Sequence, residues 1–223
     1  MSSFQLAYIP IGVPTFELVS AGEQFEKSKK MLRSLCADAV CPDEMLLSID
    51  KLTAFLDGLS PDLIVLQNIT FANSAYVSEV LKRFDCPILL WTLREPVIDG
   101  GRLRLNSLTG AFSAANTIKY FRKEQFGYVF GSPEEKRVIA ETGAYIRAAQ
   151  IRKELKSLKM ASVGHTPQGF GFGRALDAEL LKSFGVTLES IEARELIEKA
   201  QAYSEDEARE YLERAAKLSL IHI

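Results

Sequence analysis

Histidine and cysteine are scarce in this chain of 223 residues, which contains two histidines and three cysteines. The cysteines, Cys36, Cys41 and Cys86, are odd in number and do not fall at the spacings of metal ligands. Zinc coordination would therefore have almost no donors to use. We interpret the cysteines as small buried apolar residues in a reducing cytoplasm, with no redox role.

Long apolar runs and an excess of either charge are also missing. No window approaches the roughly 18 apolar residues of a membrane span. The start, MSSFQLAYIPIG, lacks the cationic and apolar regions of a secretion signal. The net charge is −2 with interspersed signs, so nothing favours nucleic acid or an anionic membrane as a partner. We expect a cytoplasmic protein without a nucleic-acid or membrane partner.

The remaining composition is that of a globular protein. Hydrophobic residues make up 47% and charged residues 25% of the chain, and its length suits one substantial core or one and a half domains. Short apolar runs predict strands at 4–10, 62–66, 87–91, 127–130, 160–163 and 185–189. Helical periodicity and capping residues predict helices at 17–39, 50–59, 74–84, 108–122, 133–158, 175–184, 194–200 and 204–217.

Strands and helices alternate throughout, which predicts an α/β fold with parallel strands and right-handed crossovers, flavodoxin-like or Rossmann-like in type. We expect a first α/β domain at residues 1–155. Residues 156–217 read as the incomplete start of a second α/β domain, too small to cover its own sheet.

The last six residues, 218–223, are apolar-rich and follow an acidic helix directly. They match the translation of a transposon-end adaptor used in sequencing libraries. We therefore expect an artefact at 218–223 and a natural protein that continues beyond Lys217, with no functional weight on His222. The alternative is an ordinary short strand.

The segment Cys86–Gly110 is the most informative part of the chain. A buried strand ends in a polar loop broken by proline and glycine, and a helix opens through Asn106, Ser107 and Thr109. Side chains and free helix N–H groups therefore gather at the carboxyl end of a strand, where open α/β sheets bind ligands. The alternative is that Asn106 or Ser107 simply caps the helix.

Two further residues follow strands. Phe71 comes just after the expected strand 62–66 and the polar residues Gln67 and Asn68, so its ring can pack on the apolar face of a sugar while amides contact hydroxyls. Thr15 follows the first strand and can donate to a sugar hydroxyl. The alternatives are burial for Phe71 and helix capping for Thr15. Trp91 ends an apolar strand, and we expect it in the core.

A glycine-rich segment follows the strand 160–163. Its first part, Gly164–Gly169, has the spacing of a phosphate-binding loop, but Phe170 and Gly171 stand where lysine and serine or threonine are required. The run Gly169–Gly173 does not match the dinucleotide fingerprint either. The sequence thus argues against nucleotide triphosphates and dinucleotides.

Three blocks, Cys86–Gly110, Val163–Gly173 and Pro14–Glu17, resemble the amino-terminal half of the L-fucose/L-arabinose isomerase superfamily over most of residues 4–217. The resemblance implies an enzyme that interconverts an aldose and a ketose through an enediol, with a divalent metal, usually Mn²⁺, and a pair of carboxylates. It also implies that the metal ligands lie on later domains. We therefore expect no catalytic or metal-binding residue here, and an inactive chain.

The same resemblance implies which residues face the sugar. Phe71 corresponds to an aromatic residue that lines the pocket. Asn106, Ser107 and Thr109 correspond to a segment that reaches the sugar of a neighbouring subunit, which implies a homo-oligomer, a trimer or hexamer. The loop that contains His165 looks like the entry into the second domain, near the active-site cleft; the alternative is a turn whose phenylalanines cover the sheet end.

The residues that we expect to contact the sugar are thus Thr15, Phe71, Asn106, Ser107, Thr109 and His165. One position departs from the family pattern. Many relatives carry an arginine just before the Pro-Thr-Phe run, whereas this chain has Val13. Two other functions stay open: a sugar-sensing module without catalysis, and a structural flavodoxin-like domain without a ligand.

Overall fold

The computed structural model describes residues 4–122 and 126–217. The chain divides into two compact units, Met1–Lys153 and Glu154–Ile223; from the sequence we expected a boundary after residue 155. The expected artefact at 218–223 lies outside the described residues. None of the helices in the described part is long and apolar enough to cross a membrane.

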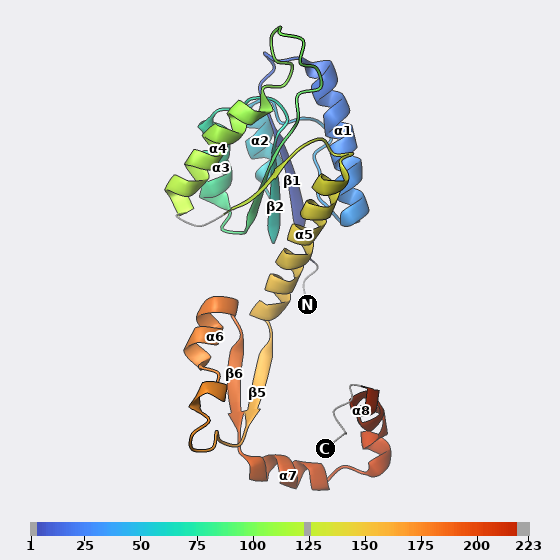
Figure 1. Cartoon of the computed structure of the whole chain (residues 1–223), viewed down its shortest axis with the longest axis vertical. Coiled ribbons are helices and arrows are strands. Elements are labelled where there is room, and N and C mark those ends of the chain that lie inside the picture. The colour runs from blue at the N-terminus through green and yellow to red at the C-terminus, as the bar shows by residue number, and fades with distance from the viewer. Residues whose placement is uncertain (1–3, 123–125, 218–223) are drawn as a thin grey trace. The chain divides into compact units, whose positions relative to one another are not determined.

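The first unit is built on a parallel sheet (Figure 1). Its strands lie in the order β1-β2-β3-β4: β1 Leu6–Ile11, β2 Leu63–Asn68, β3 Ile88–Thr92 and β4 Gly127–Phe130. The predicted α/β class with parallel strands is confirmed. The predicted end of β2 was too early, because Gln67 and Asn68 pair with β1 and β3 and are buried.

A further segment extends the sheet beyond β1. Residues 40–46 form parallel bridges Ala7↔Val40 and Ile11↔Leu46. With this segment counted as the second strand, the order becomes 2-1-3-4-5, which is the flavodoxin-like order. The sequence did not reveal it because Pro42 lacks a backbone donor and interrupts the pairing.

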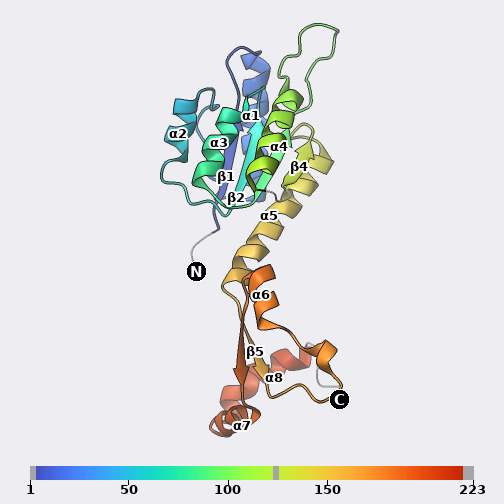
Figure 2. The same cartoon turned by 90° about the vertical axis from the view of Figure 1, so that its left-hand side faces the viewer.

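Helices cover both faces of this sheet (Figure 2). Helices α1, Leu18–Leu35, and α5, Lys136–Lys156, pack on one face. Helices α2, Ile49–Leu56, α3, Ser74–Arg83, and α4, Ser107–Arg122, pack on the other. The strands are therefore covered on both sides, which explains their continuous apolar runs.

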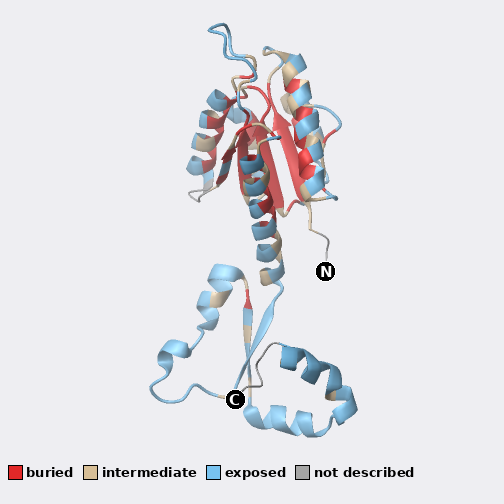
Figure 3. Cartoon of the chain, turned by 45° about the vertical axis from the view of Figure 1, so that its right-hand side comes forward, coloured by how far each residue is buried: buried red, intermediate tan, exposed pale blue. Residues whose placement is uncertain are grey.

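Burial is concentrated in the strands of the first unit (Figure 3). Alternate residues serve opposite cores, with Leu6 and Tyr8 facing α1 and α5 and Ile9 facing the other helices. Trp91 is fully buried, as predicted, and its indole N–H donates to the carbonyl of Gly131 at 2.9 Å. Full burial of a large apolar side chain contributes roughly 1.5–3 kcal/mol to the free energy of folding.

Two helix starts differ from the predictions. Glu17 caps α1 by accepting hydrogen bonds from the backbone of the first turn, so the alternative role of Thr15 as the cap is wrong. Helix α5 begins at Lys136, because Ser132 and Glu135 form a turn in place of the predicted helix start at Pro133. The predicted cap Ser48 is confirmed and accepts from Lys51 N.

The cysteines also differ from the prediction, since all three are half-buried and not buried. Burial is still sufficient to raise the pKa of the thiols of Cys36 and Cys41. None of the three forms a disulfide in the part of the chain that the structure describes.

The second unit has a small core. Its elements are β5 Lys159–Val163, a 3₁₀ turn Gly171–Gly173, α6 Asp177–Phe184, β6 Thr187–Ile191, α7 Ala193–Gln201 and α8 Glu205–Lys217. The two strands pair in parallel, yet every residue of β5 is exposed. Among its described residues, Val186 is the one buried hydrophobic side chain.

Candidate functional site

A ligand site is expected at the carboxyl edge of the first sheet. After β1 the chain crosses to segment 40–46 on one side, whereas β2 lies on the other side of β1. Such a change of direction leaves a crevice outside the carboxyl ends of the two central strands. Thr15 and Phe71 lie on the loops that follow these strands.

The loops after β1 and β2 are joined by Thr70. Its hydroxyl accepts a hydrogen bond from Val13 N at 2.9 Å and lies 3.2 Å from the Val13 carbonyl, to which it donates. The two loops approach so closely at Gly12 that a Cβ there would lie 2.5 Å from Thr70 Oγ1. Glycine is therefore needed at position 12 for space.

The loop after β3 joins the same edge. Phe71 N donates to the Leu105 carbonyl at 2.9 Å, and Glu17 N donates to the Arg104 carbonyl at 3.1 Å. The long loop between β3 and α4 is thereby attached both to the loop after β2 and to the start of α1. Three loops that are distant in sequence form one surface.

Glu95 holds this long loop in shape. Its carboxylate accepts hydrogen bonds from the backbone of Arg104 at 3.0 Å, Leu105 at 3.1 Å and Asn106. Successive N–H groups around one anion form an anion-binding turn, here occupied by a side chain of the same loop. The sequence does not indicate this role, because a glutamate in a polar loop carries no local signal.

The predicted residues at the start of α4 have different surroundings. Ser107 is buried, and its hydroxyl donates to the Asn68 carbonyl and accepts from Leu93 N at 2.9 Å, so it fastens α4 to the sheet. Asn106 has a φ of 51°, and its side chain accepts from the hydroxyl of Thr109 at 2.7 Å. Of the three, Thr109 is exposed and Asn106 is half-buried.

The side chains of Phe16, Phe71 and Arg102 form an aromatic–cation cluster on this surface. The two rings are 6.2 Å apart and tilted by 51°. The guanidinium of Arg102 lies 5.2 Å from the centre of the Phe16 ring and donates to the Thr15 carbonyl at 3.1 Å. The phenylalanines are half-buried, whereas Thr15 and Arg102 are exposed. A sugar can stack on such rings while polar groups contact its hydroxyls.

Charged groups surround the cluster. Hydrogen bonds from Ser20 and Val19, together with the charge of Arg104, hold the pKa of Glu17 below its ordinary value. The guanidinium of Arg104 also lies 3.6 Å from Asp99. The edge therefore carries both signs of charge, with Glu17 directed at the amino end of α1.

Two polar side chains are buried beneath this surface. The amide of Asn68 and the hydroxyl of Thr92 have no hydrogen-bond partner among the described residues. They are in-register neighbours at the ends of β2 and β3, and Gly110 of α4 lies so close that a Cβ there would be 2.7 Å from Asn68 Nδ2. An unpaired buried polar group lowers the free energy of unfolding by about 1–3 kcal/mol, so these two side chains destabilise the first unit.

His165 belongs to the second unit and is exposed on the loop after β5. Phe170 and Phe172 of the same loop pack on each other at 5.8 Å, but 56% and 87% of their surfaces stay exposed. The alternative in which these rings cover the end of the sheet is therefore wrong. The other residues predicted to contact the sugar, Thr15, Phe71, Asn106, Ser107 and Thr109, all belong to the first unit.

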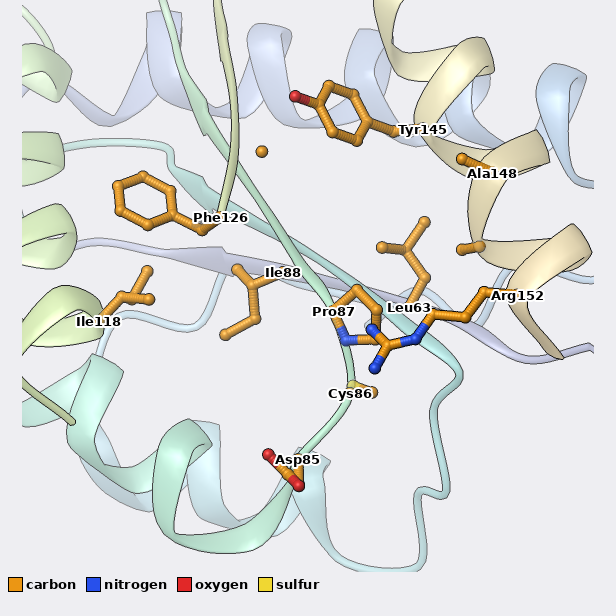
Figure 4. A pocket seen from close by; sticks show the side chains of 12 residues that line it. Leu63, Asp85, Cys86, Pro87, Ile88, Ile118, Phe126, Tyr145, Ala148 and Arg152 are labelled. Carbon is orange, nitrogen blue, oxygen red and sulfur yellow. The ribbon is translucent and has the colours of Figure 1, made fainter. Parts of the chain in front are cut away.

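A cavity of about 240 Å³ lies at the opposite end of the first sheet (Figure 4). It opens at the amino ends of β2, β3 and β4, and Tyr145 and Arg152 of α5 reach its wall. Ligands of parallel α/β sheets bind outside the carboxyl ends, so this cavity is separate from the candidate site.

The described residues do not fit the divalent metal that the resemblance implies. No group of three or more histidine, cysteine, aspartate or glutamate side chains in residues 4–122 and 126–217 could hold a metal ion. A hard divalent cation needs several oxygen or imidazole donors that converge. No metal-dependent step can therefore be assigned to these residues.

Fold and site together define the class: a doubly wound α/β domain with an aromatic surface at its switch point. No family model matches the sequence. The chain is 63% identical over 207 residues to a sulfoquinovose isomerase of Clostridium sp. (strain MSTE9), which covers 93% of the chain and 46% of that protein.

More distant relatives carry the same name. The chain is 34% identical over 220 residues to the sulfoquinovose isomerase of Priestia megaterium and 31% identical over 212 residues to that of Alkalicoccus urumqiensis. These matches cover 97% and 94% of the chain, and 49% and 47% of the relatives. The chain thus spans about half the length of the curated relatives that it matches.

Proposed function

We propose that this chain is part of an aldose–ketose isomerase that acts on sulfoquinovose. The observation that carries the proposal is the 63% identity to the Clostridium enzyme over 93% of the chain. The aromatic–cation cluster at the switch point supports it, because such a surface suits a sugar. The proposal includes the predicted relationship to the L-fucose/L-arabinose isomerase superfamily.

The reaction moves a proton between the two adjacent carbons of an aldose through an enediol, which requires acid–base groups at those carbons. In this proposal the chain binds and orients the sugar. The rings of Phe16 and Phe71 contact the apolar face of the sugar, while Thr15, Asn106 and Thr109 contact hydroxyls. Ser107 acts from beneath by fixing the start of α4.

The proposal assigns metal binding and proton transfer to residues outside this chain. The proposal places Mn²⁺, its ligands and the proton-transferring carboxylates outside this chain, because the described residues do not fit a metal. It places His165 near the cleft of the assembled enzyme. In this proposal a neighbouring subunit completes the pocket, and the whole protein is a cytoplasmic homo-oligomer, a trimer or hexamer.

The proposal is tested by incubating the whole protein, at the length of its relatives, with sulfoquinovose in D₂O and following the sugar by NMR. We expect the ketose to appear and the recovered aldose to carry deuterium at C2. The 223-residue chain alone should give neither. Absence of both products with the whole protein would refute the isomerase, and sugar binding without turnover would favour the sugar-sensing module.

A further inference from the structure

Arg102 is exposed and its charge has no acidic partner at the candidate site. Its guanidinium lies on the Phe16 ring at 5.2 Å and donates one hydrogen bond to the Thr15 carbonyl at 3.1 Å. Both partners are uncharged. Stacking fixes the plane of a guanidinium and leaves its edge available for an anion.

The other two arginines of the same loop, Arg94 and Arg104, both have acidic partners. Arg94 donates two hydrogen bonds to Glu135, and Arg104 lies 3.6 Å from Asp99. Among the ion pairs of residues 4–122 and 126–217, none includes Arg102. Glu17, the acid next to Phe16 in sequence, accepts from backbone N–H groups of α1. Arg102 is thus the arginine of this loop whose charge is not neutralised.

We propose that Arg102 binds the anionic group on C6 of the sugar and selects a sulfonate over a hydroxyl there. The inference rests on the proposed function and specifies how the substrate is recognised. Sulfoquinovose carries a sulfonate on C6, and this group keeps its negative charge at any physiological pH. Paired sulfonate oxygens match the fork of a guanidinium, as carboxylate and phosphate oxygens do.

The position of the cluster explains the selectivity. Phe71 and Phe16 offer an apolar surface to the sugar ring, and Arg102 lies at the border of that surface, on Phe16. A ring that stacks on the aromatic side chains therefore brings a substituent at its end to the guanidinium. A sugar without the anionic group stacks equally well but leaves Arg102 unpaired.

The first test uses the 223-residue chain and NMR of the arginine side chains. Sulfoquinovose, glucose and glucose 6-phosphate are titrated separately, and the Nε–H signal of Arg102 is assigned by its loss in Arg102→Lys. We expect sulfoquinovose to shift this signal at concentrations where glucose does not. An equal response to glucose, no response to sulfoquinovose, or tighter binding of the phosphate would overturn the proposal. This result does not depend on catalysis.

The second test uses the whole enzyme. Arg102→Gln should lower kcat/KM for sulfoquinovose by about 10- to 100-fold, the range expected for a charged hydrogen bond. Isomerisation of glucose should change less than threefold. Arg102→Lys should recover part of the loss, and the matched control Arg104→Gln should keep the wild-type selectivity.

The outcomes separate the two proposals. Equal losses for both sugars in Arg102→Gln would overturn the role in selectivity while leaving the isomerase intact. A whole protein that isomerises neither sugar would refute the proposed function, and the NMR titration would then still decide whether Arg102 binds the sulfonate. Thermal melting of each variant confirms that the exposed substitution leaves the fold unchanged.

Discussion

Arg94 and Glu135 join the loop after β3 to the turn after β4 through two parallel hydrogen bonds, Nε to Oε1 at 2.9 Å and Nη2 to Oε2 at 3.1 Å. The guanidinium also lies 4.8 Å from the centre of the Phe130 ring. Glu135 accepts a further hydrogen bond from Ser132 N at 2.8 Å. One carboxylate thereby connects the ends of two neighbouring strands.

These contacts predict a pH dependence. The hydrogen bonds from Arg94, followed by that from Ser132, lower the pKa of Glu135 from 4.5 to about 2. The unfolded chain therefore binds a proton at a higher pH than the folded chain does, and the contribution of Glu135 to stability is lost as the pH falls from about 4.5 to about 2. Glu135→Gln should flatten the fall in stability in this range, measured by urea unfolding at several pH values.

The control is Glu23→Gln, at an exposed position on α1. This variant should keep the wild-type slope of stability against pH. The same slope in Glu135→Gln and the wild type would show that Arg94 does not hold the carboxylate in solution.

Gly12→Ala should destabilise the first unit. The new Cβ would lie 2.5 Å from Thr70 Oγ1 and 3.2 Å from Thr70 N, so the two loops would have to separate. We expect a loss of about 1–3 kcal/mol in the free energy of unfolding, measured by urea unfolding with Trp91 fluorescence as the signal. Gly22→Ala is the matched control, because a Cβ added at Gly22 would have no atom within 4 Å. Alanine in place of glycine also stabilises a helix by roughly 0.5–1 kcal/mol. Equal stability of the two variants would disprove the close approach.

Glu95→Gln should loosen the long loop without unfolding the sheet. The amide retains one acceptor oxygen in place of a carboxylate that accepts from three backbone N–H groups. We expect faster trypsin cleavage after Arg102 and Arg104, measured by mass spectrometry, with an unchanged melting temperature. Glu23→Gln, at an exposed position on α1 outside this loop, serves as the control. Unchanged cleavage in Glu95→Gln would mean that the loop keeps its shape by other contacts.

Hydrogen exchange should distinguish the two units. The strands β1, β2 and β3 are buried at every position, whereas β5 is exposed at every position. Amides in the first sheet should therefore exchange more slowly than those of β5 by a factor on the order of 100 or more, because core segments open only with most of the global free energy. Comparable protection in the two sheets would show that β5 is covered in solution.

Local patterns predicted much of the fold. The strand Gly127–Phe130 was found at the predicted residues, and Ser48 caps α2 as expected, because apolar runs and capping residues act over a few positions. The start of α5 was misplaced, since Ser132 and Glu135 satisfy each other in a turn that sequence alone cannot distinguish from a helix start. Segment 40–46 was missed because its pairing depends on β1.

The amino-acid sequence by itself determined the alternation of strands and helices, the buried position of Trp91 and the location of the candidate site on the loops after the strands, since these follow from local hydrophobicity and turn chemistry. The tertiary structure alone decided the flavodoxin-like strand order, the role of Glu95 and the contact of Arg102 with Thr15, 87 residues away. Contacts at such separations depend on how the strands assemble, and no local pattern encodes them.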